Sequence, residues 1–532
     1  MSANETTDPG TGPERSGLVL SVLILVAAVA NLNLSVANVA LPDIGKALDA
    51  SQTGLNLIAV GYSLGLAASV LYLGAIGDRY GRKMLLLLGT AIAIPASVAA
   101  ALSGSVEVLF LARVIGGLAA GMAFPTTLSL ITVLWSGAPR TKAIALWSAV
   151  GGACAALGPL LAGAMLEQFD WGSVFLITVP FAVVALVLAF RVVPAHVDES
   201  TEPVDNLSGI MSIVLVAAIV LGLNFAPVPG KAALALGMIL VGFALTAAFL
   251  MRQRRLEYPL YDVTVASRRL FWVAASAGVI VFGSLMAAIF IGQQFLQNVL
   301  AYSTLEAGAS ILPAAFLMML VAPHSAKLVE TKGSRFTLLL GYGFCLAAFI
   351  TMLLFWRDGC SFLPIGVAFG FMGIGVGLAG TPASHSLTSS VPSKKAGMAS
   401  ATADLQRDLG GAIMQSILGA LLTAGYAAAV NATLAAAPNG SQVTDSVQSQ
   451  LTKSFGSATT VAEQYPQYST AIINGAKESF VQGQDWAYLV GAIAVALGGV
   501  LVFTMFPKLQ EEQRLLDEYA SADSELAPAA TE

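Results

Sequence analysis

The chain has 532 residues, of which 56% are hydrophobic and only 11% are charged, and its formal net charge is −5. A soluble domain would carry about a quarter charged residues, so this composition excludes a soluble globular protein and indicates a polytopic membrane protein. The 31 acidic residues outnumber the 26 basic ones, which does not favour a nucleic-acid partner. The three cysteines are far apart in the sequence and indicate neither a disulfide framework nor a metal site.

Fourteen apolar segments of the chain are long enough to cross about 30 Å of hydrocarbon. They predict an all-α membrane protein with 14 transmembrane helices, and this even number places both termini on one side of the bilayer. The segments are 17–41, 54–75, 84–104, 107–133, 142–166, 171–192, 208–227, 231–251, 269–293, 305–324, 336–355, 361–381, 396–425 and 485–506.

The distribution of Lys and Arg predicts the orientation, because cytoplasmic loops carry an excess of both. With cytoplasmic termini, the inner loops and tails hold 19 of the 26 basic residues. We therefore expect a multi-pass protein of the plasma membrane with both termini in the cytoplasm. The outer loops then hold only five: Lys46, Lys231, Arg357, Lys453 and Lys477.

The run 74–83 joins the second and third apolar segments and combines glycines with charges. Asp, Arg and Lys each cost about 2.5 to 3.5 kcal/mol at the centre of a membrane, so this run must be a short turn at the membrane surface. Such a turn could simply fix the orientation. The alternative is a gate whose charges bind helix ends, formed by Gly74, Asp78, Arg79, Gly81, Arg82 and Lys83.

Arg113 lies inside the fourth apolar segment and not at its end. An arginine in hydrocarbon is a functional candidate that faces an aqueous cavity or a polar partner, although a structural arginine remains the alternative. In the fifth segment, Gly158, Pro159 and Gly163 permit close helix packing, and the proline removes a backbone hydrogen bond and bends the helix.

The thirteenth apolar segment contains Asp404, Arg407 and Asp408, whose spacings of three and four residues place them on one helical face. Charges there are costly unless the face lines an aqueous cavity and the charges pair. One acid held by Arg407 and a second left freer would form a proton switch, and the spacing does not choose between the two. The alternative is a structural ion-pair cluster.

Two connecting segments are longer than the others. Residues 193–207 form an acidic connection, and residues 426–484 form an extracytoplasmic loop rich in Ser, Thr, Gln, Asn and Ala. The long loop is expected to contain short helices or a hairpin, or else to be a disordered spacer.

These motifs together resemble the 14-helix drug:proton antiporter branch of the major facilitator superfamily. The loop 74–83 resembles the first signature of the superfamily, and the fourth and fifth segments resemble its helix 4 and antiporter signatures. The matching residues are Gly74 to Lys83, Arg113 with Gly117, Gly158-Pro159 with Gly163, Asn38 to Pro42, and Gly410-Gly411.

The resemblance implies a major facilitator fold with two six-helix bundles that rock about a central site. It divides the chain into tails at 1–16 and 507–532, bundles at 17–192 and 269–506, and a linker at 193–268 with two inserted helices. Helix 1 would then line the cavity with the neutral polar row Asn31, Ser35 and Asn38, which can bind a substrate or the facing bundle.

The chain departs from that branch at Asn33, where an Asp is frequent. Asparagine cannot carry a proton, so proton coupling is expected at Asp404 and Asp408.

The predicted function is secondary active export of lipophilic or cationic drug-like compounds by proton antiport with alternating access. Alternatives are export of an endogenous lipid or metabolite, and a membrane receptor or scaffold without transport. The scattered histidines and cysteines do not favour an enzyme, and no nucleotide-binding loop is present. We expect a monomer in the lipid bilayer that binds a small-molecule substrate and protons, without cofactor, metal or nucleic acid.

Overall fold

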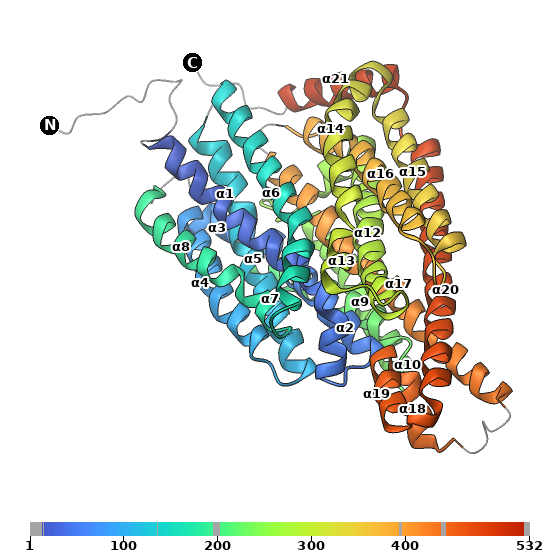
Figure 1. The fold of residues 1–532 in the computed structure, drawn as a ribbon. Coiled ribbons are helices and arrows are strands. Elements are labelled where there is room, and N and C mark those ends of the chain that lie inside the picture. The colour runs from blue at the N-terminus through green and yellow to red at the C-terminus, as the bar shows by residue number, and fades with distance from the viewer. Residues whose placement is uncertain are drawn as a thin grey trace.

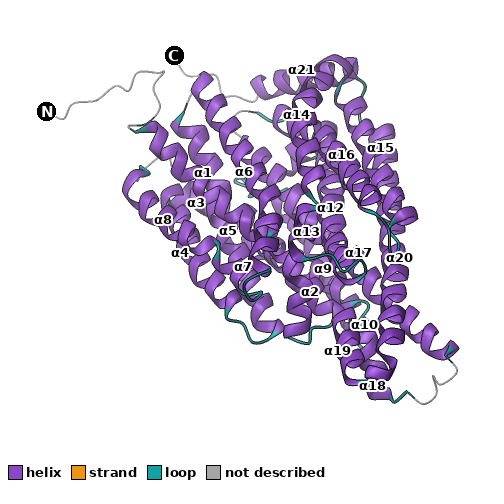
Figure 2. Cartoon of the chain, in the orientation of Figure 1, coloured by secondary structure: helices purple, strands orange, loops and turns teal. Residues whose placement is uncertain are grey.

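The computed structural model describes residues 13, 15–135, 137–194, 203–392, 396–437 and 443–525. Every regular element within these residues is a helix and none is a strand (Figure 2). The all-α prediction is therefore confirmed. Most of the acidic connection predicted at 193–207 lies outside the described residues.

The first group of helices, here called the N-terminal group, contains eight helices that pack on one another (Figure 1). Side chains of Ser51 and Ser105 cap α3 and α5 by accepting hydrogen bonds from backbone N–H groups three residues on. The group consists of α1 (Ser16–Ser35), α2 (Ala37–Ala47), α3 (Gln52–Tyr80), α4 (Arg82–Ala101), α5 (Val106–Leu134), α6 (Gly137–Leu166), α7 (Ser173–Leu176) and α8 (Thr178–Val192).

Three further helices follow: α9 (Asn206–Phe225), α10 (Ala232–Gln253) and the short α11 (Val263–Ala266). Their role as a linker between two bundles stays a prediction. Helix α9 packs on both α3 and α17, whereas α10 packs on α9. Burial separates these positions clearly, because 78% of the apolar window of α3 is buried and only 17% of that of α10. Helix α10 therefore lies at the periphery of the described structure.

The C-terminal group contains the remaining helices of the described chain (Figure 1). Helix α17 is its centre, because it packs on α12, α16 and α20 and also on α3 of the N-terminal group. The group consists of α12 (Arg269–Asn298), α13 (Thr304–Ala309), α14 (Leu312–Lys332), α15 (Ser334–Phe355), α16 (Phe362–Ser389), α17 (Ala396–Ala436), α18 (Asp445–Lys453), α19 (Phe455–Gln464), the 3-10 turn η3 (Pro466–Tyr468), α20 (Ser469–Met505) and α21 (Leu509–Glu525).

Thirteen helices within the described residues are long and apolar enough to cross a membrane. They coincide with thirteen of the fourteen predicted spans. The remaining span, predicted at 142–166, falls on α6, where the described apolar stretch covers only Leu157–Leu166. A fourteenth crossing therefore stays a prediction.

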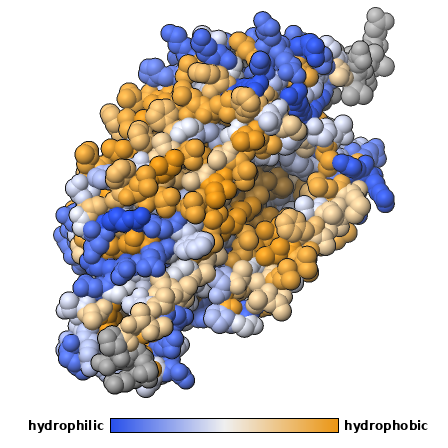
Figure 3. Space-filling model, turned by 90° about the vertical axis from the view of Figure 1, so that its right-hand side faces the viewer, coloured by the Kyte–Doolittle hydropathy of each residue, from blue (hydrophilic) through white to orange (hydrophobic). Residues whose placement is uncertain are grey.

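Hydrophobic side chains form a broad band around the visible face of the molecule, with hydrophilic side chains at both ends (Figure 3). Such a band fits the hydrocarbon layer of a membrane. The first residues of α1 and the whole of α21 lie at one end of the molecule, here called the terminal end (Figure 1). Helices α18 and α19 lie at the opposite end, here called the far end.

The long loop predicted at 426–484 is mostly helical. Helix α17 extends to Ala436 and α20 begins at Ser469, so both are longer than their apolar segments. Between them lies a compact segment, here called the cap, which comprises residues 443–468. The side chains of Thr444 and Ser454 accept backbone hydrogen bonds at the N-termini of α18 and α19. Phe455 and Ala458 are buried against neighbouring helices. Of the two alternatives for this loop, the structure shows short helices.

Candidate functional site

A cleft of about 220 Å³ lies between the two groups of helices at their terminal end. One wall comes from α3 and α5 and the other from α17 and the segment before α11. Its lining includes three predicted gate residues and one predicted proton-coupling residue. These are Gly74, Asp78, Arg82 and Asp404.

The ion pair of Asp78 and Arg82 stands at the mouth of this cleft. The Arg82 Nη2 atom lies 2.8 Å from Asp78 Oδ1, and Arg82 Nε donates to the same oxygen at 2.9 Å. The Asp78 side chain is 46% exposed, whereas that of Arg82 is 13% exposed. One carboxylate oxygen of the pair is thus engaged by the arginine while the side chain still reaches the cleft.

The other gate residues shape the turn between α3 and α4. Gly81 separates the two helices with a φ of 119°, which side-chain-bearing residues rarely adopt. Lys83 Nζ donates to the backbone oxygen of Phe190 at 2.9 Å and so ties the turn to the end of α8. The Arg79 guanidinium lies 5.9 Å from the ring centre of Tyr80. These residues therefore fix the conformation of the turn. Gly74 lies on α3, and no atom lies within 4 Å of the position that its Cβ would take.

The charged cluster of α17 divides into two parts. Arg407 Nε lies 3.5 Å from Asp408 Oδ1, and the Asp408 side chain is only 1% exposed. Asp404 is less buried, lines the cleft and forms no ion pair with the described residues. One acid is thus held by the arginine while the other faces the cleft.

Arg407 also contacts the N-terminal group. Its guanidinium carbon lies 5.0 Å from the ring centre of Phe124 on α5, a cation–π geometry that a buried site strengthens. Phe124 is itself buried and packs on Trp147, whose indole donates to Thr127 Oγ1 at 2.9 Å. The arginine of α17 therefore rests on a fixed aromatic platform across the seam between the groups.

Arg113 lies inside the N-terminal group and not at the cleft. Its Nη1 atom donates to the backbone oxygen of Asn33 at 2.6 Å, and its guanidinium stacks on Tyr62 and Phe175 at 4.8 and 5.7 Å. Its Nε and Nη2 atoms have no hydrogen-bond partner among the described residues. They border a void of about 10 Å³, at the lower limit for one water molecule.

The side chain of Asn33 has a structural hydrogen-bond network of its own. Its amide oxygen accepts hydrogen bonds from Thr178 at 3.2 Å and Ser97 at 3.4 Å. Asn33 therefore joins α1 to α4 and α8 inside the N-terminal group. Asparagine cannot carry a proton, but here its hydrogen bonds hold three helices together, which is a structural role.

The polar row of α1 and α2 is spread over three environments. Asn31 is buried and donates to the backbone oxygen of Ala27 at 3.0 Å. Ser35 packs so closely on α6 that a Cβ atom on Gly158 would clash with its hydroxyl. Asn38 is buried, and its side-chain oxygen has no hydrogen-bond partner among the described residues. The structure places none of these three side chains in the lining of the cleft.

The Gly–Pro segment of α6 meets the C-terminal group at α13. Thr304 Oγ1 donates to the backbone oxygen of Gly163 at 2.9 Å, and a Cβ atom on Gly163 would clash with the Thr304 backbone. A Cβ atom on Gly308 would likewise clash with the backbone oxygen of Pro159. These glycines allow two backbones to touch across the seam, and the predicted bend at Pro159 stays a prediction.

Further contacts close the far end of the seam. Gln52 Nε2 donates to Gln294 Oε1 at 2.9 Å, and both side chains are buried. Gln297 Nε2 donates to the backbone oxygen of Val39 at 2.9 Å, and Asn56 Nδ2 donates to Thr423 Oγ1 at 3.1 Å. The sequence marks Gln294 and Gln297 as polar residues at the outer end of a helix, but it does not reveal their partners on the other group, so sequence reasoning missed this seal.

The cap adds an ion pair to the same end. Lys453 Nζ lies 2.5 Å from Asp49 Oδ2, and Ser457 donates to the other oxygen of that carboxylate at 3.0 Å. The hydrogen bond from Lys453 lowers the pKa of Asp49 below its ordinary value, although partial burial opposes this effect. The two groups are thus closed at the far end and separated by a cleft at the terminal end.

Comparison with known proteins agrees with this architecture. A solved bacterial homolog of the human lysosomal transporter Spinster, in an inward-facing and unoccupied conformation, superimposes with a TM-score of 0.62. Its sequence is 17% identical, and the match covers 93% of this chain and 98% of that chain. The likeness shows a shared fold.

Sequence relatives are more informative. The multidrug efflux pump LfrA of Mycolicibacterium smegmatis is 34% identical over 408 residues, which cover 76% of this chain and 81% of that protein. The methyl viologen resistance protein SmvA of Salmonella typhimurium is 32% identical over 418 residues, or 76% of this chain and 82% of that protein. The sequence model of the Major Facilitator Superfamily matches residues 23–415, and this multi-pass membrane protein belongs to that family.

Proposed function

We propose that this protein is a drug exporter driven by proton antiport. The printed names of its relatives support the substrate class, because LfrA is called a multidrug efflux pump and SmvA a methyl viologen resistance protein. Methyl viologen is an organic dication. In the cleft, Asp78 is paired with Arg82 and Arg140 is a second cation, so Asp404 is the carboxylate that would attract such a charge.

The proposed transport cycle moves the two bundles, residues 17–192 and 269–506, against each other around the seam. Inward orientation of both termini follows the positive-inside rule, so the terminal end would face the cytoplasm of a cell-membrane protein. The cleft would then admit substrate from inside while the far end is sealed by the contacts of Gln52, Gln297 and Thr304. Export requires the seal to open and the cleft to close.

One observation carries the assignment of the proton site: Asp404 lines the cleft, whereas Asp408 is buried against Arg407. A proton carrier needs access to water, and Asp404 on the cleft wall is better placed for this than the buried Asp408. Protonation of Asp404 would remove one of two negative charges beside Arg407 and leave that arginine to Asp408 and Phe124. Loss of the charge also lowers the attraction for a cationic substrate, which couples the two ligands.

Everted membrane vesicles that contain the full chain test this assignment. With a proton gradient imposed, wild-type protein should accumulate a lipophilic cationic dye, and dye addition should release protons. Asp404→Asn should abolish both, yet still exchange dye down its own gradient. The matched control Asp517→Asn changes an exposed acid on α21 and should behave as wild type.

Two outcomes would contradict the proposal. Uphill dye transport with proton release in Asp404→Asn would move the carrier elsewhere. If the wild-type protein inserts normally but its vesicles transport no dye, the proposal that it exports lipophilic cations is wrong.

A further inference from the structure

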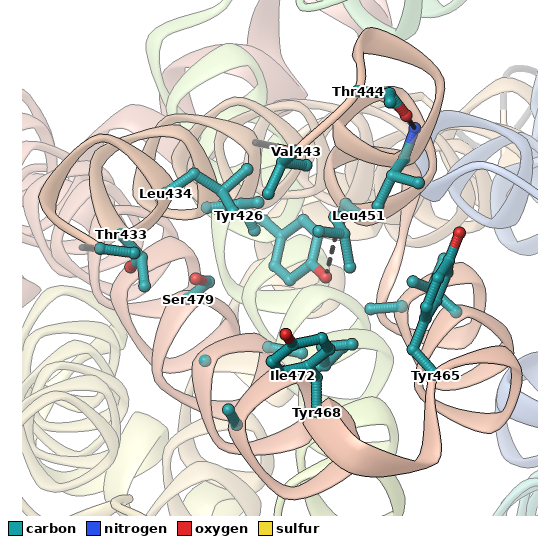
Figure 4. Close-up of a pocket in the computed structure, with 18 residues that line it drawn as sticks. Tyr426, Thr433, Leu434, Val443, Thr444, Leu451, Tyr465, Tyr468, Ile472 and Ser479 are labelled. Carbon is teal, nitrogen blue, oxygen red and sulfur yellow. Dashed lines mark hydrogen bonds between the residues drawn. The ribbon is translucent and has the colours of Figure 1, made fainter. Parts of the chain in front are cut away.

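A second cavity, of about 430 Å³, lies at the far end, between the end of α17, the cap and the beginning of α20. It is separate from the cleft at the terminal end, because the two share no lining residue. Cavities of about 300 to 1,000 Å³ commonly hold small organic molecules. Figure 4 shows three tyrosines around this space: Tyr426 on α17, Tyr465 directly after α19, and Tyr468 in η3.

The described lining of this cavity is mostly apolar and carries no charged side chain. No Asp, Glu, Lys, Arg or His occurs among its described lining residues, which are mostly aliphatic. The phenol of Tyr426 is already used, because it donates to the backbone oxygen of Leu451 at 3.1 Å. Tyr465 and Tyr468 are 40% and 56% exposed, so both rings lie at the edge of the cavity, where an aromatic ligand could stack on them.

One polar group in the lining has no partner. Ser479 is 1% exposed, and its hydroxyl makes no hydrogen bond to any residue that the structure describes. A buried hydroxyl without a partner costs about 1 to 3 kcal/mol, so such groups normally bind something. Figure 4 places Ser479 beside Thr433 on the wall formed by α17 and α20.

We propose that this cavity binds an uncharged lipophilic small molecule that carries one hydrogen-bonding group. The aliphatic lining and the tyrosine rings would take its apolar body, and the Ser479 hydroxyl its polar group. A phospholipid fits the cavity less well, because its phosphate would find no cationic partner in the described lining. The same argument disfavours a free cation, which would find no carboxylate.

This site goes beyond the proposed transport function and does not depend on it. Helix α17 is continuous from Ala396 to Ala436, so the helix that carries Asp404 near one end contributes Tyr426 and Val430 to this cavity near the other. Binding here is a property of the protein at rest and needs no gradient.

Fluorescence titration of the full chain in lipid nanodiscs tests the proposal. The probe is N-phenyl-1-naphthylamine, which is uncharged, aromatic and carries one N–H group. Wild-type protein should show a saturable signal above that of empty nanodiscs. Gly475→Leu should abolish this signal, because Gly475 lines the cavity and an added Cβ atom meets nothing closer than 3.8 Å. Ser479→Ala should raise the Kd between about twofold and tenfold, the value of one hydrogen bond.

Two matched controls separate binding from folding. Asn474→Leu adds the same side chain to an exposed neighbouring position of α20, and Ser449→Ala removes an exposed hydroxyl from α18. Both should bind the probe as wild type does. Ser479→Ala removes a single oxygen atom, so it remains informative where Gly475→Leu unfolds the cap.

Three results would overturn the proposal: no saturable signal in wild type, an unchanged signal in Gly475→Leu, or an unchanged Kd in Ser479→Ala. Mass spectrometry of the purified protein provides a fourth. If a stoichiometric phospholipid accompanies wild type but not Gly475→Leu, and the probe binds only after that lipid is removed, the occupant is a lipid chain.

Discussion

Two buried arginines, Arg113 and Arg407, stand in opposite electrostatic settings. Arg113 has one backbone hydrogen bond, two aromatic rings and no ion pair with an acid of the described chain. Arg407 has an acid on its own helix and one ring from the opposite group of helices. Both side chains are held by π faces, but only Arg407 is placed where a carboxyl group can change its charge balance.

The difference separates a fixed charge from an adjustable one. No acid among the described residues forms an ion pair with Arg113, and its contacts with Asn33 and Phe175 join α1, α5 and α7. Arg407 spans the seam that must rearrange during transport, and Asp404 lies one turn away on the same helix. A change of charge at Arg407 is therefore felt by both groups of helices.

Removal of the Arg407 charge should have the largest effect. Arg407→Gln leaves Asp408 buried without its cation, which costs about 3 to 5 kcal/mol in comparable pairs. We expect a lower melting temperature and loss of uphill export. The double variant Arg407→Gln/Asp408→Asn should recover most of the stability, because the uncompensated charge is gone, but not the export.

The control for this experiment is Arg514→Gln, since Arg514 forms an exposed pair on α21. Both properties are measured on one preparation, by thermal unfolding in detergent and by dye export after reconstitution. Full export in the double variant would make the pair purely structural.

Arg113→Lys should have the second largest effect. Lysine keeps the charge but lacks the planar fork that donates to Asn33 while it lies flat against Tyr62. Loss of one charged hydrogen bond predicts a destabilisation of roughly 1.5 to 3 kcal/mol and loss of most export. The measurement is the same pair of assays, with Arg514→Lys as the control. Normal export with normal stability would show that only the charge of Arg113 matters.

The apolar segments predicted the helices well, because backbone groups in hydrocarbon must satisfy their hydrogen bonds within a helix. Spacing alone also placed Asp404, Arg407 and Asp408 on one face. It could not find Phe124 beneath Arg407, because that contact joins two groups of helices that no periodicity relates. It could not orient Arg113 either, since an apolar helix has no polar face to reveal which side meets a cavity.

The extensions of α17 and α20 beyond their apolar segments could not be predicted, for a different reason. The last turns of α17 are mostly Ala, and the first turns of α20 mix Ala and Ile with polar residues, so no strongly apolar run marks them. Their helical state comes from packing against α18 and α19. Tertiary contact thus supplies what local composition does not.

Asp78→Asn should affect export strongly and stability weakly. The Asp78–Arg82 pair is half exposed on the acid side, and exposed pairs contribute at most about 1 kcal/mol. Its place at the mouth of the cleft makes the carboxylate available to helix ends of the other group when the cleft closes. We therefore expect normal insertion and melting temperature but several-fold slower dye export. Wild-type rates would remove Asp78 from the gate.

Loss of the Asp49–Lys453 ion pair should have the smallest effect on stability. This pair is exposed, in contrast to the buried Arg113 and Arg407. Folding lowers the pKa of Asp49 from its ordinary 3.8, chiefly through the hydrogen bond from Lys453. The folded protein therefore binds this proton less readily than the unfolded chain, so the stabilisation is complete above 3.8 and disappears as the pH falls through the lowered pKa. The acid is 59% exposed, which limits the effect to well under about 1 kcal/mol.

Asp49→Asn should consequently lower the melting temperature slightly at pH 7, and the difference from wild type should vanish at pH values below the lowered pKa. Asp445→Asn, which removes an exposed acid from the first turn of α18, controls for general changes in charge. If the difference in melting temperature persists or grows in acid, the contribution of Asp49 comes from its contacts with Ser457 and the loop backbone. A protonated carboxyl keeps those contacts but loses its attraction to Lys453.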